Sequence, residues 1–331
     1  MRKGNISIFV PHIGCPHKCS FCNQNTITGC ESAPTPKDVV NAVETALSKS
    51  SKDFDFEIAF FGGSFTAIDR DYMLSLLEAA KPYVDNKSVK GIRCSTRPDF
   101  ITEEILDILK SYGVSAIELG AQSMVDEVLK KNMRGHTSDD VRNASELIKS
   151  YDIELGLQMM TGLYSSNHEK DIYTAKEIIK LKPKTVRVYP TVVLKDTYLA
   201  KVFESGDYKV DSIEDTVSLC AKIIPLFEQN NIKVIRLGLH ASEDIKANIC
   251  AGGYHDSLGE LVQSKIMLDE ILKYEKGDYT VFINQKSLSK LVGNKKSNLQ
   301  KLDSFGYKIK IEFDNSLNVN ELRLEYGIKN T

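Results

Sequence analysis

Short apolar runs alternate with longer segments of helical period along the first two thirds of the chain. The runs are rich in Val, Ile and Phe and predict strands at 6–10, 57–61, 91–95, 115–119, 153–159 and 185–189. The segments between them carry apolar stripes flanked by Lys and Glu and predict helices at 37–49, 71–84, 102–111, 138–150 and 169–181. Each gap has room for a crossover helix, so the pattern predicts an α/β fold, a partial (β/α)6 TIM-like barrel over residues 1–205.

The alternation of predicted strands and helices changes after residue 205. A long helix at about 211–230, a strand at 233–239, a Gly-rich turn at 251–254 and a helix ending near residue 274 predict an extension over 206–275 that packs on the barrel. Residues 279–331 then follow a strand, helix, helix, strand, strand pattern, which predicts a small α+β module.

Two helix starts are well marked. Thr102 precedes two glutamates, and Ser138 precedes two aspartates. A hydroxyl followed by acidic residues satisfies the first free N–H groups and favours the helix dipole. We therefore expect Thr102 and Ser138 to be N-caps.

Composition and charge exclude several classes of protein. The 331 residues are 42% hydrophobic and 27% charged, with 43 Lys and Arg against 45 Asp and Glu, which is typical of a globular chain with a large core. No apolar run approaches the roughly 20 residues of a membrane-spanning helix. The N-terminus also lacks the pattern of a secretory signal, so a cytoplasmic location is expected.

The cysteines carry the strongest chemical signal. Of seven cysteines, Cys15, Cys19 and Cys22 follow the spacing Cys-x3-Cys-x2-Cys in the loop after the first predicted strand. Three thiolates this close can hold one 4Fe–4S cluster and leave one iron open for chemistry. A structural zinc that recruits His12, His17 or a distant Cys is an alternative, as are three metal-free thiols. Cys30, Cys94, Cys220 and Cys250 have no ligand spacing and are expected to be small buried side chains.

The cysteine triplet, with Phe21 before its last member, resembles the signature of radical S-adenosylmethionine (SAM) enzymes. Five later blocks resemble the radical SAM half of the Elongator catalytic subunit family over roughly residues 5–270. They are Gly62-Gly63-Ser64-Phe65-Thr66, Thr96-Arg97-Pro98-Asp99, Glu118-Leu119-Gly120-Ala121-Gln122-Ser123, Arg134-Gly135-His136-Thr137 and Tyr189-Pro190-Thr191. At 331 residues, the chain is not expected to carry the acetyltransferase domain of that family as well.

The resemblance implies a three-cysteine 4Fe–4S cluster whose open iron binds SAM, and reductive cleavage that yields a 5'-deoxyadenosyl radical. A reductant such as flavodoxin or ferredoxin is then implied as a partner. It also implies contacts to SAM from the Gly-Gly block, where backbone groups would bind the methionine ammonium, and from Arg134, which would pair with the carboxylate. The full set of implied SAM contacts is Phe21, Gly62, Gly63, Ser64, Ser95, Thr96, Glu118, Gln122, Arg134 and Gln158.

The C-terminal module resembles a KH domain, in which a Gly-x-x-Gly turn between two helices clamps a nucleic-acid backbone. The corresponding turn here is Gly293-Asn294-Lys295-Lys296, so a lysine replaces the second glycine. Residues 279–313 hold seven Lys against two acids, whereas the whole chain has a net charge of -2. This contrast predicts RNA contacts, for which the candidates are Lys290, Lys295, Lys296 and Lys301.

These observations favour a radical SAM enzyme acting on RNA, with tRNA as the expected substrate. Two alternatives stay open: radical modification of a small metabolite or peptide, and a zinc-dependent RNA-binding protein without catalysis.

Overall fold

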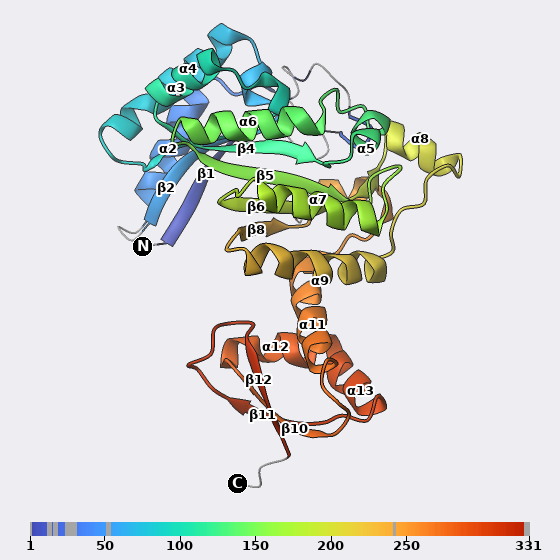
Figure 1. Cartoon of the computed structure of the whole chain (residues 1–331). Coiled ribbons are helices and arrows are strands. Elements are labelled where there is room, and N and C mark those ends of the chain that lie inside the picture. Colours follow the sequence, from blue (N-terminus) through green and yellow to red (C-terminus); the bar gives the residue numbers. More distant parts are fainter. Residues whose placement is uncertain are drawn as a thin grey trace. The chain divides into compact units, whose positions relative to one another are not determined.

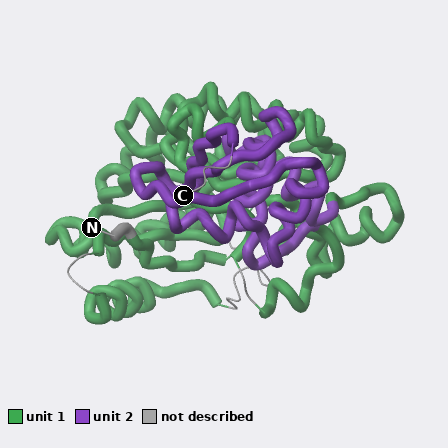
Figure 2. The backbone as a smooth tube through the Cα atoms, turned by 90° about the horizontal axis from the view of Figure 1, so that it is seen from below, with its two compact units in different colours: residues 1–211, 226–252 green, residues 212–225, 253–331 purple. Residues whose placement is uncertain are grey.

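The computed structural model describes residues 2–11, 15, 19–23, 32–50, 54–240 and 243–327. Figure 2 shows two compact units: residues 1–211 with 226–252 form unit 1, and residues 212–225 with 253–331 form unit 2. The division into a barrel, an extension and a module predicted from the sequence stays a prediction.

Unit 1 is built on a curled parallel sheet in the order β1-β2-β3-β4-β5-β6-β8 (Figure 1). This architecture confirms the predicted α/β fold with a partial TIM-like barrel. All six predicted strands are present. The strands are β1 (Arg2–Val10), β2 (Phe54–Gly62), β3 (Gly91–Thr96), β4 (Val114–Gln122), β5 (Glu154–Thr161), β6 (Thr185–Pro190) and β8 (Lys233–Leu237).

Strand β8 corrects one expectation. The strand at 233–239 was predicted to belong to an extension packed on the barrel, but it pairs in parallel with β6 and adds a seventh strand to the same sheet. The free edge of β6 explains this placement, because the unpaired N–H and C=O groups of an edge strand gain hydrogen bonds from a further strand.

The predicted helices of unit 1 follow their strands and lie along the outside of the sheet (Figure 1). They are α2 (Pro36–Lys49), α3 (Arg70–Asp85), α4 (Glu103–Ser111), α6 (Ser138–Ser150) and α7 (His168–Lys180). Shorter elements complete the unit: α5 (Asp126–Lys131), β7 (Val192–Leu194), α8 (Tyr198–Glu204), α10 (Glu243–Asn248) and β9 (Ile249–Gly252), with β7 antiparallel to β9. Helix α9 (Ile213–Gln229) has residues in both units.

The two predicted caps have different outcomes. Thr102 is the N-cap of α4 and accepts a hydrogen bond from the N–H of Ile105. The prediction of Ser138 is wrong by one residue, because Thr137 caps α6 and Ser138 is the first helical residue. Thr137 prevails because it forms a reciprocal capping box with Asp140, which satisfies two backbone N–H groups at once.

Unit 2 has a three-stranded sheet in the order β11-β10-β12, formed by β10 (Asp278–Ile283), β11 (Lys308–Phe313) and β12 (Leu322–Tyr326). Its helices are α11 (Leu258–Ile271), α12 (Leu288–Val292) and α13 (Ser297–Ser304). The strand, helix, helix, strand, strand order predicted for this segment is therefore confirmed. Its core joins α11 to the sheet through Met267, Leu268, Ile271, Val281, Ile283, Leu291 and Leu302.

Within the part of the chain that the model describes, no helix combines the length and the apolar character that crossing a membrane requires.

Candidate functional site

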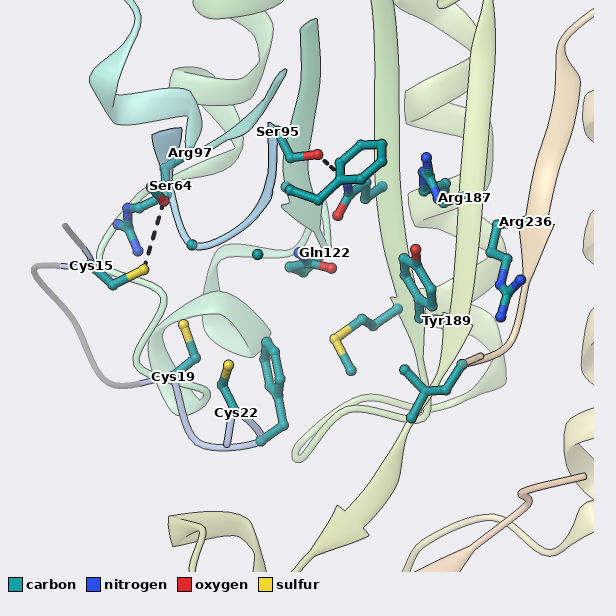
Figure 3. Close-up of a pocket in the computed structure, with 18 of the residues that line it drawn as sticks. Cys15, Cys19, Cys22, Ser64, Ser95, Arg97, Gln122, Arg187, Tyr189 and Arg236 are labelled. Carbon is teal, nitrogen blue, oxygen red and sulfur yellow. Dashed lines mark hydrogen bonds between the residues drawn. The ribbon is translucent and has the colours of Figure 1, made fainter. Parts of the chain in front are cut away.

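A pocket of about 440 Å³ opens in unit 1 at the carboxyl ends of the parallel strands. This is the edge at which barrels of this kind hold their active sites. Cys15, Cys19 and Cys22 line one side of the pocket, and Arg187, Tyr189 and Arg236 line the other side (Figure 3). Four arginines line it in all, and no Asp or Glu from the described residues does.

The three cysteines turn their sulfur atoms toward the same region of the pocket (Figure 3). All three are half-buried and are free of disulfides. The Sγ of Cys15 lies 4.0 Å from the Oγ of Ser64, and the Sγ of Cys19 accepts a hydrogen bond of 3.0 Å from Arg134 Nη1. The loop that carries them is anchored by the N–H of Ser20, which donates to the carbonyl of Asn132.

The donor set suits an iron–sulfur cluster, because three thiol sulfurs face the same region of the pocket. No group of three His, Cys, Asp or Glu side chains among the described residues is arranged to hold one metal ion. His12 and His17, the candidate fourth ligands of a zinc site, lie outside the described residues.

The remaining cysteines differ in their burial. Cys94 and Cys220 are fully buried as predicted, and burial raises the pKa of Cys94 to about 12, which keeps it a neutral thiol. The prediction for Cys250 is wrong, because it is exposed on β9, a strand of four residues. Cys30 lies outside the described residues.

The Gly-Gly block places backbone where a side chain would not fit. Gly62 ends β2 with a φ of 109°, a conformation that favours glycine. The N–H of Gly63 donates to the carbonyl of Val10, and a Cβ on Gly63 would lie 2.9 Å from the carbonyl oxygen of Pro11. The two glycines thus let the ends of β1 and β2 approach closely beside the cysteine loop.

Arg97 is a pocket residue whose role the sequence did not indicate. Its side chain is 3% exposed and is held by two hydrogen bonds to Asp99 and one from Nη2 to the carbonyl of Arg134. Its Nη1 is buried without a hydrogen-bond partner among the described residues. A buried guanidinium N–H without an acceptor is costly, so this atom is poised to bind an anionic or carbonyl oxygen.

Gln122 shows a related feature on the same wall. It ends β4 with a φ of 63°, next to a bulge in the pairing of β4 with β5. Its Oε1 is buried and has no hydrogen-bond donor in the described part of the chain. Backbone strain together with an unpartnered carbonyl is characteristic of a site that receives a ligand.

Arg134, predicted to meet a carboxylate, makes a hydrogen bond from each of its three nitrogens, which uses three of the five N–H groups that a guanidinium carries. Nη1 donates to Cys19, Nη2 donates to the carbonyl of Gly120, and Nε donates to Nε2 of His136. Burial and the Arg134 charge lower the pKa of His136 to about 4, so its ring is neutral and can accept this bond. Arg134 therefore supports the cysteine loop directly.

Glu118 lies 1% exposed beneath the pocket and organises the far wall. It pairs with Arg187 through both oxygens and lies 3.5 Å from Arg93 Nη1, while Gln158 donates to it at 3.2 Å. Burial opposes the charge of Arg187, but the carboxylate outweighs it and raises the pKa of Arg187 above its usual range. Gln158 also donates to Ser95 at 3.3 Å, so one carboxylate positions several lining side chains.

The predicted site residues are placed as follows. Phe21, Gly62, Gly63, Ser64, Ser95, Thr96, Gln122, Arg134, Gln158 and the three cysteines line this pocket, and Glu118 lies beneath it. Sequence reasoning missed Arg97, Arg187 and Arg236. The available signal for Arg187 and Arg236 was an arginine with an apolar residue on each side in a strand, because a charge there needs a buried partner or a ligand.

The lysines predicted to meet RNA lie in unit 2. Lys295 and Lys296 form the exposed turn between α12 and α13 and have φ values of 50° and 64°. Asn298 fixes the turn by donating to the carbonyls of Lys290 and Leu291. Lys301 is exposed on α13, whereas Lys290 donates to Asn320 at 2.7 Å.

Two family models and several known proteins match this chain. The model of the radical SAM superfamily matches residues 9–178, and that of the Radical_SAM C-terminal domain matches residues 183–267. The chain is 29% identical over 230 residues to the tRNA uridine(34) acetyltransferase of Methanocaldococcus jannaschii, covering 62% of this chain and 41% of that protein. It is 31% identical over 191 residues to human Elongator complex protein 3, covering 51% of this chain and 35% of that protein.

Solved structures share the fold. The archaeal Elp3 of Methanocaldococcus infernus, with an N-terminal deletion, superposes with a TM-score of 0.65 at 22% identity, over 82% of this chain and 64% of that one. SuiB of Streptococcus suis bound to S-adenosylmethionine superposes with a TM-score of 0.52 at 15% identity, over 73% of this chain and 52% of that one. The superfamily match covers more than half of the chain and includes all three cysteines of the pocket. The chain therefore belongs to the radical SAM superfamily and is a radical SAM enzyme with a 4Fe–4S cluster and SAM as its cofactors.

Proposed function

We propose that this enzyme modifies RNA, with tRNA as the substrate class. The observation that carries the proposal is a pocket in which three thiols face a lining with four arginines and, among the described residues, no carboxylate. Arg97 and Arg187 are paired with Asp99 and Glu118, but the described residues give Arg236 no carboxylate, and this charge favours an anionic substrate. The relatives named as tRNA uridine(34) acetyltransferases support the choice of tRNA, although the chain spans only 41% and 55% of their lengths. The proposal therefore covers the radical step alone.

The cluster-binding role falls to Cys15, Cys19 and Cys22, whose sulfurs share one side of the pocket. When bound, the cluster supplies the electron that cleaves the carbon–sulfur bond of SAM to give a 5'-deoxyadenosyl radical. Arg134 would place a positive charge against the sulfur of Cys19 and disperse the negative charge of the ligand set.

The SAM-binding role falls to the wall next to the cysteines. We assign the carboxylate of SAM to Arg97, whose Nη1 has no hydrogen-bond partner among the described residues, rather than to Arg134, each nitrogen of which already makes one hydrogen bond. Gln122 Oε1 would accept a hydrogen bond from SAM, and the backbone of Gly62 and Gly63 leaves room for the amino group. Ser64, Ser95, Thr96 and Gln158 supply further polar contacts, and Phe21 supplies an apolar one.

Recognition of RNA outside the pocket falls to unit 2. The exposed pair Lys295 and Lys296 stands on a turn that Asn298 holds in place, and the segment 279–313 carries seven Lys against two acids. An exposed basic turn of this kind suits phosphate contacts. The reductant, flavodoxin or ferredoxin, and the cytoplasmic location stay predictions.

The experiment is an anaerobic incubation of reconstituted enzyme, SAM and reductant with unfractionated tRNA, followed by mass spectrometry of the nucleosides. The proposal predicts a mass change in a nucleoside that depends on SAM and is absent with Cys19→Ala. If 5'-deoxyadenosine forms but its yield does not respond to RNA and no nucleoside changes, the substrate is a small metabolite or a peptide.

Binding by unit 2 is tested with Lys295→Glu combined with Lys296→Glu. We expect weaker tRNA binding and a shallower dependence of affinity on salt, because each phosphate contact releases counterions. A matched control reverses the charge at Lys87 and Lys182 by substitution with Glu. These two lysines are also exposed and also have a positive φ, but they lie in unit 1, just before the amino ends of strands. Equal losses from both pairs would contradict a specific role of the unit 2 turn.

A further inference from the structure

We propose that Arg236, beside Arg187 and Tyr189, forms an anion subsite that receives a backbone phosphate of the RNA substrate next to the nucleotide being modified. The inference rests on the proposed function and names the part of the site that would bind a phosphodiester.

The register of the sheet brings the two arginines together. Arg187 of β6 and Arg236 of β8 are direct partners across the parallel pair, at an inter-strand spacing of about 4.8 Å. The pairing is interrupted by a bulge, since Val186 pairs with Val234 and the next partners are Arg187 and Arg236. Ile235 is the extra residue on β8.

The bulge changes the face of the sheet on which the Arg236 side chain lies. In an uninterrupted register, Arg236 would be the partner of Val188, which is fully buried on the other face of the sheet. The extra residue instead places it opposite Arg187, so both side chains reach the pocket (Figure 3). Bulges beside active sites serve this purpose.

Only one of these two charges is neutralised. Glu118 pairs with Arg187 through both oxygens, and the Arg187 guanidinium also stacks 5.0 Å from the centroid of the Phe61 ring. Arg236 donates its Nε to the carbonyl of Gly238, which carries no charge, and the described residues give it no carboxylate. The positive charge of Arg236 is therefore not compensated by the described residues, and an anion bound in the pocket would neutralise it.

SAM does not supply an anion for Arg236. Its single anionic group is the carboxylate, which we assign to Arg97 on the cysteine side, across the pocket from Arg236 (Figure 3). Phe61 and Tyr189 line the space around the arginine pair. Aromatic rings beside an arginine suit a nucleotide, because the base can stack on a ring while the phosphate meets the guanidinium.

The test measures binding of a synthetic stem–loop RNA carrying uridine 34, made as a series in which single phosphodiesters are replaced by neutral methylphosphonates. Wild-type holoenzyme is compared with Arg236→Gln and Arg236→Lys, and with Lys233→Gln as a matched control on the exposed end of β8. Melting temperature and iron content are recorded for each variant.

We expect one methylphosphonate to weaken wild-type binding roughly tenfold or more, as loss of a charged hydrogen bond does. Arg236→Gln should bind the unmodified RNA equally weakly and be insensitive to that replacement, Arg236→Lys should recover part of the affinity, and Lys233→Gln should match the wild type. Persistent sensitivity in Arg236→Gln, or unchanged affinity, overturns the subsite. An Arg236→Gln loss without any sensitive linkage also overturns it, because the anion is then another group of the substrate. A wild-type enzyme that binds no RNA instead overturns the proposed function.

Discussion

Arg134 Nη1 lies 3.0 Å from the sulfur of Cys19 and donates a hydrogen bond to it. The two residues are far apart in the sequence, and the contact joins the loop after α5 to the cysteine loop. A positive charge on one ligand sulfur stabilises the more negative, reduced state of a cluster held there.

Arg134→Gln removes this charge and keeps a hydrogen-bonding side chain. We expect iron content to be retained and the reduction potential of the cluster to become more negative, because the reduced form loses a stabilising charge. Redox titration followed by electron paramagnetic resonance measures the shift. Arg142→Gln is the matched control, since Arg142 of α6 is paired with Asp139 of α6 and Glu177 of α7. A potential equal to that of wild type would remove Arg134 from this role.

Arg97→Lys tests the assignment of the SAM carboxylate. Lysine can keep the ion pair with Asp99 but cannot present a fixed Nη1 to the pocket. We expect the dissociation constant for SAM to rise about tenfold or more while the cluster is retained. Calorimetric titration of reconstituted protein with SAM is the measurement. If Arg97→Lys binds SAM with wild-type affinity and Arg134→Gln binds it more weakly, the carboxylate of SAM is bound by Arg134 and not by Arg97.

Glu118→Gln tests the carboxylate that holds the far wall of the pocket. The substitution leaves Arg187 without its anion, whereas Arg93 keeps its ion pairs with Glu57 and Glu154, so we expect the free energy of unfolding to fall by about 3 kcal/mol. Urea denaturation measures it. Glu104→Gln, which removes the exposed partner of Arg70, should have little effect. A small loss in Glu118→Gln would show that the network is not needed for stability.

Asp171 of α7 predicts a pH dependence. Burial raises its pKa to about 6, with nearby Asp211 adding to the rise, while Ser166, the Gly162 N–H and His168 oppose it. The folded state therefore holds this proton more tightly than the unfolded state. Its stabilising effect is complete below about pH 4 and is lost as the pH rises through 6, at a cost of up to roughly 3 kcal/mol.

The measurement is urea denaturation of wild type and Asp171→Asn between pH 4.5 and 7.5, a range that spans the pKa of about 6. The free energy of unfolding of wild type should fall relative to the variant as the pH rises. A difference that does not vary with pH would mean that Asp171 titrates normally in the folded protein.

Much of the fold and one side of the site could be predicted from the sequence. Apolar periodicity located the strands from β1 to β6, and close spacing located Cys15, Cys19 and Cys22, because both signals are local. The arrangement of Arg187 with Arg236 could not be predicted in this way. It depends on β8 joining the sheet, on a bulge at Ile235 and on Glu118, which lies 69 residues before Arg187. All three depend on contacts between residues that are far apart in the sequence, which local patterns do not indicate.

The central claim is that three cysteines hold a 4Fe–4S cluster that SAM contacts directly. The most direct measurement is electron paramagnetic resonance of anaerobically reconstituted, reduced protein with and without SAM. We predict about four irons per chain, a cluster signal that SAM changes, and loss of both in Cys19→Ala. A signal that SAM leaves unchanged, or iron retained at the wild-type level by Cys19→Ala, would contradict the account.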